Sequence, residues 1–446
     1  MASTYLTRTP GSAGDRKKWT LSGWYKRSAN AADYLLSSGQ YSSTQLSQIL
    51  FEGDDYFNVA FYSTGASLEG HLETNRKFRD PSAWYHIVVA MDTAQAGSSD
   101  RVKIYVNGVQ QTSFKTETYP AQDYETSINN NVAQNIGRRE GSGFYNGQMA
   151  HVHFCDGQAY AASDFGETDA TSGMWIAKTS PSVTYGTNGF FLKYASGASG
   201  TDSSGNSNDF TVSGTMTNLK DSPDNNFATG NFLYSGYTYP TGATEGNGNT
   251  TWTGTTGWRG TYSTLGAASG KWYGEFKCAS SAGANNCVAG FLNAATNEDI
   301  SDAAVGQPAS TAALTNAGVI MQDGSDRVSA LTTYTTGDIV SCAIDITNGF
   351  MYWAVNGTWV NSGDPTSGAT GTGGYAISNI ATGGLYLFGV GGDGATSWNM
   401  NFGNGYFGTT AISTAGTSSS GDDSIWEYDC PTGYYGLNTN NLGSYS

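Results

Sequence analysis

Two short segments carry acidic residues at a spacing that could support hydrolysis of a glycosidic bond. In Glu167-Thr-Asp169 and in Glu427-Tyr-Asp429, two carboxylates stand two residues apart. Glycoside hydrolases need a carboxylate on each side of the scissile bond, and residues i and i+2 of a strand share a face. Neither pair is followed by the third acidic residue that such a strand motif would carry. After the first pair, Ser172 occupies that position. We therefore expect no catalytic residues and no enzyme, with polysaccharide hydrolysis as the weakest alternative.

A histidine pair is the next pattern with a chemical meaning. His151-Val-His153 places two imidazoles on one face of an expected strand, and Cys155 follows on that face. Imidazole and thiolate are ligands that zinc prefers. No fourth ligand is evident, so we favour a partly polar sandwich face and predict no metal site. None of the four histidines lies in a Ser-His or Cys-His pattern that would activate a nucleophile.

Three acidic loops offer oxygen ligands that could hold calcium. These are Glu52-Gly-Asp54-Asp55, the stretch from Asp202 to Asp209, and Asp323-Gly-Ser-Asp326. Asp and Asn are also common in turns, because their side chains accept hydrogen bonds from their own backbone. We favour this structural role and expect no cofactor, with calcium as the alternative.

Aromatic residues in Gly- and Thr-rich surroundings are the candidate ligand-binding residues. Trp252 and Trp258 lie in TTWTGTTGWRG, and Trp359 lies in NGTWVNSG, two residues after a turn signal. A flat aromatic ring is a platform for a sugar ring, but Trp is equally common in a core. The setting favours exposure for Trp359 and core packing for Trp258.

The composition of the chain indicates that the candidate residues lie on β-strands and the turns between them. Gly numbers 60, aromatic residues make 13% and charged residues 13% of the 446 residues. Such a chain disfavours helix and suits strands joined by tight turns. With 21 Lys and Arg against 37 Asp and Glu, the net charge is −16, which disfavours nucleic acid as a partner. No apolar run of 18 residues and no apolar signal core occur, so we expect no membrane insertion and no export signal.

Hydrophobic patterning predicts a similar series of strands in each half of the chain. A Gly-, Ser- and Asn-rich stretch separates the two halves. Asn107-Gly108 and Asn356-Gly357 each follow an apolar run and predict two-residue hairpins. The expected strands are 19–26, 48–51, 57–62, 84–91, 101–106, 132–137 and 148–155, then 271–278, 287–292, 318–322, 338–346, 350–355, 385–390 and 397–402.

The five cysteines are too few and too scattered for a disulfide framework, and we expect them to be reduced. Cys278 and Cys287 flank a Gly-rich connection and could face each other across a hairpin. A disulfide bond between Cys278 and Cys287 is the alternative to five reduced cysteines.

Several segments resemble known domains. RKKWTLSGWYKRS, WYHIVVAMDT, DRVKIYVNGVQ and NIGRREGSGFYNGQMAHVHFCDGQAY resemble a laminin-G-like, concanavalin-type jelly roll. SGKWYGEFKC, GDIVSCAIDITNGFMYWAVNG and LYLFGVGG with WNMNFG resemble a SPRY domain. The implied fold class is all-β, with two concanavalin-like antiparallel β-sandwiches joined by an extended Gly/Ser/Asn-rich segment. The expected division is a jelly roll at 1–175, a connecting segment at 176–249, a SPRY-like sandwich at 250–422 and a C-terminal tail at 423–446.

The opening YLTRTPGSAGDRKKWTLSGW, the middle GFFLKYASGASGTDSSGNSNDFTVSG with DSPDNNFATGN, and the close CPTGYYGLNTNNL resemble virion proteins of tailed, notably marine, bacteriophages. This resemblance implies a tail-fibre-like or capsid-decoration protein in the virion, assembled in the host cytoplasm. Its expected partners are other virion proteins and host cell-surface polysaccharide, which it would bind for adsorption, and a homo-oligomer is expected on the particle. A purely structural cement protein of capsid or tail is the alternative.

Overall fold

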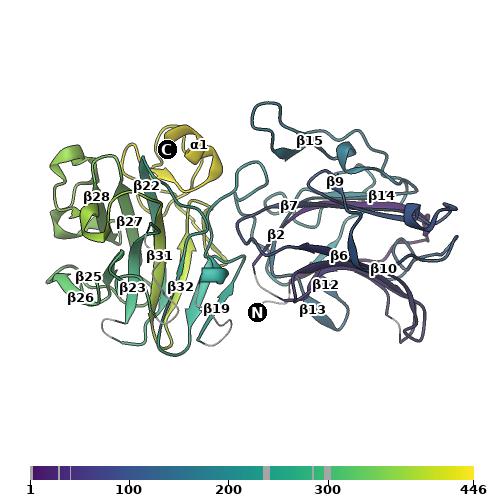
Figure 1. The fold of residues 1–446 in the computed structure, drawn as a ribbon, viewed down its shortest axis with the longest axis horizontal. Helices are drawn as coiled ribbons and strands as arrows, with labels where there is room; N and C mark the ends of the chain where they lie inside the picture. The colour runs from purple at the N-terminus through teal and green to yellow at the C-terminus, as the bar shows by residue number, and fades with distance from the viewer. Residues whose placement is uncertain (1–3, 29–30, 41, 235–241, 284–285, 296–302) are drawn as a thin grey trace. The chain divides into compact units, whose positions relative to one another are not determined.

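The computed structural model describes residues 4–28, 31–40, 42–234, 242–283, 286–295 and 303–446. The chain forms two compact units, Met1–Asn218 and Leu219–Ser446. Strands account for 43% and helices for 7% of the structure, which confirms the expected all-β class. Each unit holds two large sheets packed on a shared apolar core, and Figure 1 shows these layers within each unit. Among the described residues, no helix has both the length and the apolar character needed to cross a membrane.

The first unit is a sandwich of an eight-stranded and a six-stranded antiparallel sheet, with two short hairpins beside them. The eight-stranded sheet runs, in spatial order, β10 (Phe114–Thr118), β6 (Leu68–Lys77), β5 (Tyr56–Tyr62), β4 (Leu46–Phe51), β3 (Asp33–Ser38), β11 (Gln134–Ile136), β1 (Tyr5–Arg8) and β18 (Thr211–Ser213). The six-stranded sheet runs β17 (Phe190–Leu192), β14 (Gly147–Asp156), β2 (Lys18–Arg27), β7 (Tyr85–Asp92), β8 (Val102–Val106) and β9 (Val109–Gln110). The hairpins are β12 (Arg138–Arg139) with β13 (Ser142–Phe144), and β15 (Gly166–Thr168) with β16 (Trp175–Ala177).

Alternation along the strands explains how this sandwich forms. In β2, Trp19, Leu21 and Tyr25 point into the core between the sheets, whereas Trp24 points to the opposite face. The apolar strand β7 is buried along seven of its eight residues, as its sequence predicts. Its outer face is covered by the segment 157–188, which carries β15 and lies over the six-stranded sheet in Figure 1.

The second unit repeats the two-sheet architecture. Its nine-stranded sheet contains, in spatial order, β19 (Ala243–Gly246), β20 (Thr251–Gly254), β32 (Ser397–Asn401), β22 (Lys271–Ser280), β27 (Ile339–Asp345), β28 (Phe350–Val355) and β29 (Thr358–Trp359), with β30 (Tyr375–Ala376) on β28 and β35 (Tyr435–Gly436) parallel to β22. Its six-stranded sheet contains β21 (Trp258–Tyr262), β31 (Tyr386–Asp393), β23 (Cys287–Asn293), β24 (Thr311–Thr315), β25 (Val319–Gln322) and β26 (Ser325–Val328). A hairpin of β33 (Tyr406–Phe407) and β34 (Thr410–Ala411) completes the strands.

Helices in both units are short. The described 3₁₀ helices are η1 (Ser98–Asp100), η2 (Ala162–Asp164), η3 (Phe232–Tyr234), η4 (Val360–Ser362), η5 (Pro365–Thr370) and η6 (Ile377–Ile380), and the α-helix is α1 (Thr439–Tyr445). Both expected hairpins form. Asn107-Gly108 joins β8 to β9 and Asn356-Gly357 joins β28 to β29, with positive φ at all four residues.

Two parts of the expected domain division lie inside the compact units. The segment 176–249 contributes β17 and β18 to the sheets of the first unit and β19 to a sheet of the second, and its residues 235–241 lie outside the described residues. The segment 423–446 packs on the outer face of the nine-stranded sheet, where Trp426, Cys430 and Tyr434 are buried against Tyr273 and Tyr352. This packing covers an apolar sheet face that would otherwise meet water.

All five cysteines are free and buried. The Sγ atoms of Cys278 and Cys287 lie 3.2 Å apart. They meet between the two sheets rather than across a hairpin, because β22 belongs to the nine-stranded sheet and β23 to the six-stranded sheet.

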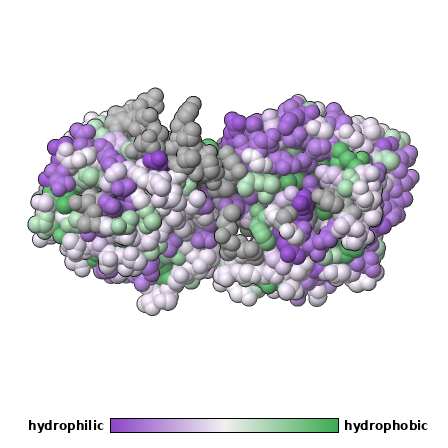
Figure 2. Space-filling model, turned by 90° about the horizontal axis from the view of Figure 1, so that it is seen from below, coloured by the Kyte–Doolittle hydropathy of each residue, from purple (hydrophilic) through white to green (hydrophobic). Residues whose placement is uncertain are grey.

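The surface is mainly polar. Figure 2 shows one face on which hydrophilic residues predominate and hydrophobic residues are scattered. The most exposed large apolar side chains are Val109 and Met174, at 64% and 63%. Isolated apolar residues of this kind are ordinary on a protein surface.

Candidate ligand-binding site

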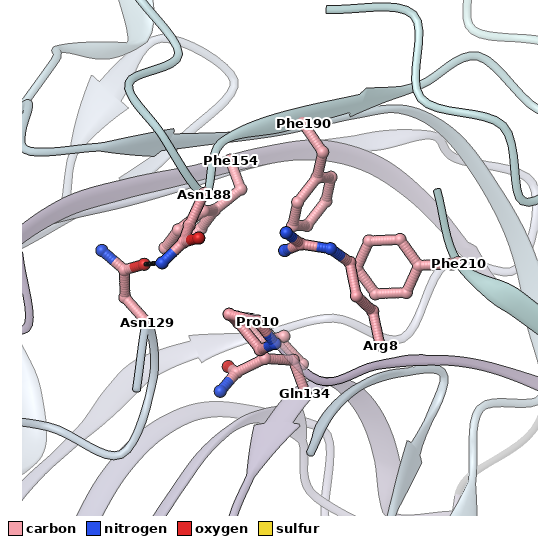
Figure 3. A pocket seen from close by; sticks show the side chains of 9 residues that line it. Arg8, Pro10, Asn129, Gln134, Phe154, Asn188, Phe190 and Phe210 are labelled. Carbon is pink, nitrogen blue, oxygen red and sulfur yellow. Dashed lines mark hydrogen bonds between the residues drawn. The ribbon is translucent and has the colours of Figure 1, made fainter. Parts of the chain in front are cut away.

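A small hollow opens at one end of the first sandwich, between its two sheets. It is shallow: its space of about 270 Å³ includes open solvent, and the centre of a water molecule can occupy only about 10 Å³ of it. Figure 3 shows side chains from both sheets and from the connecting loops converging on it. Its lining consists of apolar walls and uncharged amides around one cation, namely Arg8, Pro10, Leu36, Asn129, Gln134, Phe154, Asn188, Phe190 and Phe210.

Strand register places Arg8 in this hollow. Leu6 pairs with Ile136 and Ile136 pairs with Leu36, and all three are buried in the core. Two residues further along each strand, Arg8 pairs with Gln134 and Gln134 with Ser38. Because side chains on a strand alternate between faces, this polar row lies on the same inner face as the apolar row. The core therefore ends in a polar rim.

Arg8 is half-buried, and Figure 3 shows its side chain beside those of Phe190 and Phe210, which also line the hollow. Its guanidinium donates a hydrogen bond to Oδ1 of Asn208. Burial lowers the pKa of Arg8, and the nearby charge of Asp202 opposes this shift. An arginine side chain nonetheless stays protonated in proteins, so the hollow contains a fixed positive charge.

Asp202 does not form an ion pair with this arginine. Its carboxylate oxygens accept hydrogen bonds from the backbone N–H groups of Phe191, Ser204 and Asn208, and from the Ser204 hydroxyl, at 2.8–2.9 Å. These four donors hold the 202–208 loop in a compact turn. The carboxylate thereby orients Asn208, which in turn orients Arg8.

A network of amides and one carboxylate forms the opposite side of the hollow. Asn188 Nδ2 donates to Asn129 Oδ1 at 3.0 Å, the bond drawn in Figure 3. Asp156 accepts hydrogen bonds from Asn129 Nδ2 at 2.6 Å and from the backbone N–H groups of Asp15 and Asn188. Each loop is thus tied to the end of β14, so the amides are held in place before any ligand binds.

Several polar atoms at the hollow remain available. Asn208 takes one of the five N–H donors of Arg8, and the other four have no hydrogen-bond partner among the described residues. Asn188 Oδ1 and Gln134 Oε1 likewise accept no hydrogen bond from the described residues, although both amide nitrogens are fully used. The site can therefore donate to an anion and accept from hydroxyl groups.

Aromatic rings supply the apolar part of the site. The rings of Phe190 and Phe210 meet edge to face, with centroids 4.7 Å apart and planes at 72°. Phe154 stacks on Phe190 at 5.5 Å. No acidic side chain lines the hollow, so its residues lack the carboxylate pair that glycoside hydrolysis requires. This arrangement can bind a ligand but offers no general acid or base.

Of the three tryptophans expected to bind ligand, Trp252 lies in a core. Its side chain is fully buried in the core of the second unit and pairs across the sheet with Trp398. Alternation along β20 points it between the sheets, so neither face of its ring is accessible for stacking.

The other two tryptophans keep part of their surface exposed. Trp258, at the start of β21, packs against the small cluster around Tyr262. Trp359, in β29, meets Tyr273 and Tyr352 edge to face, each with ring centroids 6.5 Å away. The structure does not bring these three tryptophans into one site, because Trp258 and Trp359 belong to different sheets.

The acidic and histidine patterns have structural roles. Asp169 caps a turn by accepting from the Ser172 backbone and hydroxyl, and Asp429 accepts from the Thr417 backbone. Asp55 is paired with Arg27 and Arg79, at 3.3 and 2.9 Å. Within the described residues, no group of three His, Cys, Asp or Glu side chains could hold a metal ion.

His151 and His153 both stack on Phe191, whereas Cys155 is buried away from solvent. His153 and Cys155 share the outer face of the six-stranded sheet, where both contact Phe165, and a bulge in β14 lies between Ala150 and His153. His153 Nδ1 is hydrogen-bonded to the Tyr185 hydroxyl at 2.8 Å. Burial lowers the pKa of His153 well below its usual value, so the ring is neutral.

Sequence reasoning missed the hollow and its arginine. The only local signal is YLTR in β1, where a charged residue occupies the position that alternation gives to the core. The lining residues are spread along the chain from Arg8 to Phe210, and only the sandwich brings them together.

Comparison with known proteins agrees with the architecture of the first unit. Residues 2–163 match the family Laminin_G_3, described as the concanavalin A-like lectin/glucanases superfamily. The matched region is about a third of the chain, and the two-sheet sandwich of the first unit agrees with it. No curated protein matches the chain.

Solved structures similar to parts of the chain include a native heptameric SAP-like pentraxin from Limulus polyphemus. It is 12% identical, with a TM-score of 0.29, and the match covers 40% of this chain and 86% of the pentraxin. The SPRY domain of human HERC1 is 13% identical, with a TM-score of 0.27 and coverage of 36% and 94%. Another human SPRY domain is 12% identical, with a TM-score of 0.24 and coverage of 34% and 90%. Similarity this low carries no argument about function.

Proposed function

We propose that this chain is a non-catalytic virion protein of a tailed bacteriophage that binds host-surface polysaccharide through the hollow of its first unit. The observation that carries the proposal is the concanavalin A-like lectin/glucanases match over residues 2–163. Six of the nine residues that line the hollow lie inside the matched region, and Asn188, Phe190 and Phe210 follow it in the chain. The virion assignment comes from the sequence resemblance of the opening, middle and closing segments.

The chemistry of the hollow supports a sugar ligand. Sugar rings present apolar C–H faces that stack on aromatic rings, and hydroxyl groups that pair with amides. Phe190 and Phe210 are buried and offer only the edges of their rings as an apolar wall for the first kind of contact, and Asn188 and Gln134 offer the second. Because these side chains are already fixed by hydrogen bonds and packing, little conformational entropy is lost when a ligand binds.

A binding assay on the purified full-length chain tests the first part of the proposal. Immobilised capsular and lipopolysaccharide preparations from host bacteria should retain the protein, and Phe190→Ala should weaken retention by removing part of the apolar wall of the hollow. Phe57→Ala, a change of the same kind in the core of the same unit, controls for loss of stability. If no host polysaccharide retains the folded wild-type chain, the proposal is wrong.

Phage adsorption tests the biological part. Soluble protein should compete with whole phage for attachment to host cells if the chain acts in adsorption. A cement protein would leave adsorption unchanged, and virions that lack it would be fragile or fail to assemble. The proposal also expects no release of reducing ends from the bound polysaccharide, whereas release that Glu167→Gln abolishes would identify a hydrolase.

A further inference from the structure

We infer that the hollow selects polysaccharides that carry hexuronic acids, with the sugar carboxylate bound by Arg8. This inference rests on the proposed function and names the class of ligand. Its starting point is the half-buried Arg8, whose guanidinium lines the hollow and has no carboxylate partner among the described residues.

Arg27 of the same unit shows how a fully buried arginine is paired. Arg27 is buried, and its guanidinium is paired with Asp33 at 3.2 Å and Asp55 at 3.3 Å. Arg8 has no carboxylate within 4.0 Å among the described residues. A buried charge is costly unless it is paired, so Arg8 leaves a position for an anion that the protein itself does not fill.

The neighbouring Asp202 cannot easily take this position. Both of its oxygens already accept two hydrogen bonds each from the 191–208 region. Moving it toward Arg8 would leave buried backbone donors unsatisfied, which costs about 1–3 kcal/mol for each group. Asp202 therefore lowers the local potential without neutralising the guanidinium directly.

The geometry of the hollow favours a carboxylate attached to a sugar ring. Four N–H donors of Arg8 remain after the bond to Asn208, so two of them can bond the two oxygens of a planar carboxylate. The hollow has room for little more than one water-sized group, so a carboxylate oxygen would enter it while the sugar ring stays outside its mouth. Asn188 Oδ1 and Gln134 Oε1 can then accept from ring hydroxyls, which a free inorganic anion would not use.

The charge distribution along the chain agrees with an anionic ligand on the first unit. Although the whole chain is acidic, all but five of its 21 Lys and Arg residues lie in residues 1–218. The exceptions are Lys220, Arg259, Lys271, Lys277 and Arg327. An acidic polysaccharide is thus repelled less by the first unit than by the second.

The test compares three forms of one polymer on the full-length protein by calorimetry. These are oligogalacturonate, its methyl ester, and the carboxyl-reduced galactan of equal length. We expect wild type to bind the acid form about tenfold more tightly than the two neutral forms, with an affinity that falls as salt is raised. Arg8→Gln should bring all three affinities together, and Arg8→Lys should keep a reduced preference because lysine lacks the planar fork.

Arg76→Gln is the matched control, because Arg76 is an exposed arginine on β6 of the same unit and the change in charge is the same. It should keep the preference for the acid form. Circular dichroism of each variant verifies the fold. If Arg8→Gln does not fold, the affinities of Arg8→Lys and the comparison of acid and ester on wild type still test the inference.

Three results would overturn the inference. One is equal binding of the acid and neutral polymers by wild type, which would leave the proposed glycan binding intact. Another is an unchanged acid preference in folded Arg8→Gln. The third is equal binding of a poly(glycerol phosphate) chain, which would indicate a general anion site. Failure of wild type to bind any polysaccharide would instead count against the proposed function.

Discussion

The carboxylate of Glu275 holds the backbone of Tyr428, 153 residues later in the chain, with a hydrogen bond of 2.9 Å. It also accepts from the Glu427 backbone N–H at 2.8 Å and from the Tyr273 hydroxyl at 3.0 Å. Glu275 is fully buried on β22, and burial raises its pKa to about 7. One side chain of the sheet thus attaches the segment that covers the sheet's outer face.

Glu275→Ala should destabilise the second unit. Two buried backbone donors would lose their acceptor, which predicts a decrease of about 2–4 kcal/mol in the free energy of unfolding. Chymotrypsin should cleave the variant rapidly near Trp426 and Tyr428, because the covering segment would detach. Glu427→Ala is the control, since only its backbone contacts Glu275, and equal proteolysis of the two variants would contradict this role.

Acid should loosen the first unit at His86. The Trp175 indole donates to His86 Nδ1 at 3.0 Å, and Nε2 lies 2.9 Å from the Ser22 hydroxyl. Burial, with a smaller effect of His151, lowers the pKa of His86 to about 3. The folded pKa is below the unfolded value of about 6.5, so the stabilisation is complete above that pH and is lost as the pH falls.

From neutral pH to about pH 5, this group should reduce the free energy of unfolding by about 2 kcal/mol. Hydrogen exchange of peptides from β7 measures the effect within the first unit. His86→Gln keeps an acceptor for Trp175 but does not titrate, so its exchange should depend less on pH. An identical pH dependence in both proteins would assign the effect to another group.

Trp359→Ala tests whether this tryptophan supports the fold or binds ligand. Loss of the contacts with Tyr273 and Tyr352 should lower the free energy of unfolding by about 1–3 kcal/mol, with a smaller loss for Trp359→Phe. Urea unfolding measures this change. We expect polysaccharide binding by the folded variant to persist, and its selective loss would establish Trp359 as a stacking platform.

The thiols should be unreactive in the native chain. All five cysteines are buried, and burial raises the pKa of Cys155 to about 12. A thiol titration under native conditions should therefore detect almost none, and unfolding in guanidinium should expose all five. Two fewer thiols in the unfolded chain would mean that Cys278 and Cys287 are oxidised to a disulfide.

The strands that sequence reasoning located are those with clear alternation or continuous apolar runs, such as β7 and β27. It missed β6, whose sequence LEGHLETNRK is largely polar because much of its outer face is wet. It also missed β3, where Asp33 is buried but paired with Arg27, a contact that no local pattern indicates.

The ligand-binding residues were harder to predict. Trp252 carries the same local signals as an exposed tryptophan, and only its pairing with Trp398 places it in the core. The hollow depends on the register that aligns Arg8, Gln134 and Ser38, residues far apart in the chain. Register of this kind follows from long-range pairing and cannot be read from one segment.

The pairing of β1 with β18 also determines when the hollow can exist during synthesis. Tyr5 pairs with Ser213, so the strand that carries Arg8 gains its last neighbour only after more than 200 further residues have been made. Contacts of such sequence separation form slowly, because a long loop must close before they contribute. During synthesis on the ribosome, β1 therefore lacks this neighbour until β18 has emerged. The hollow around Arg8 can close only after that point.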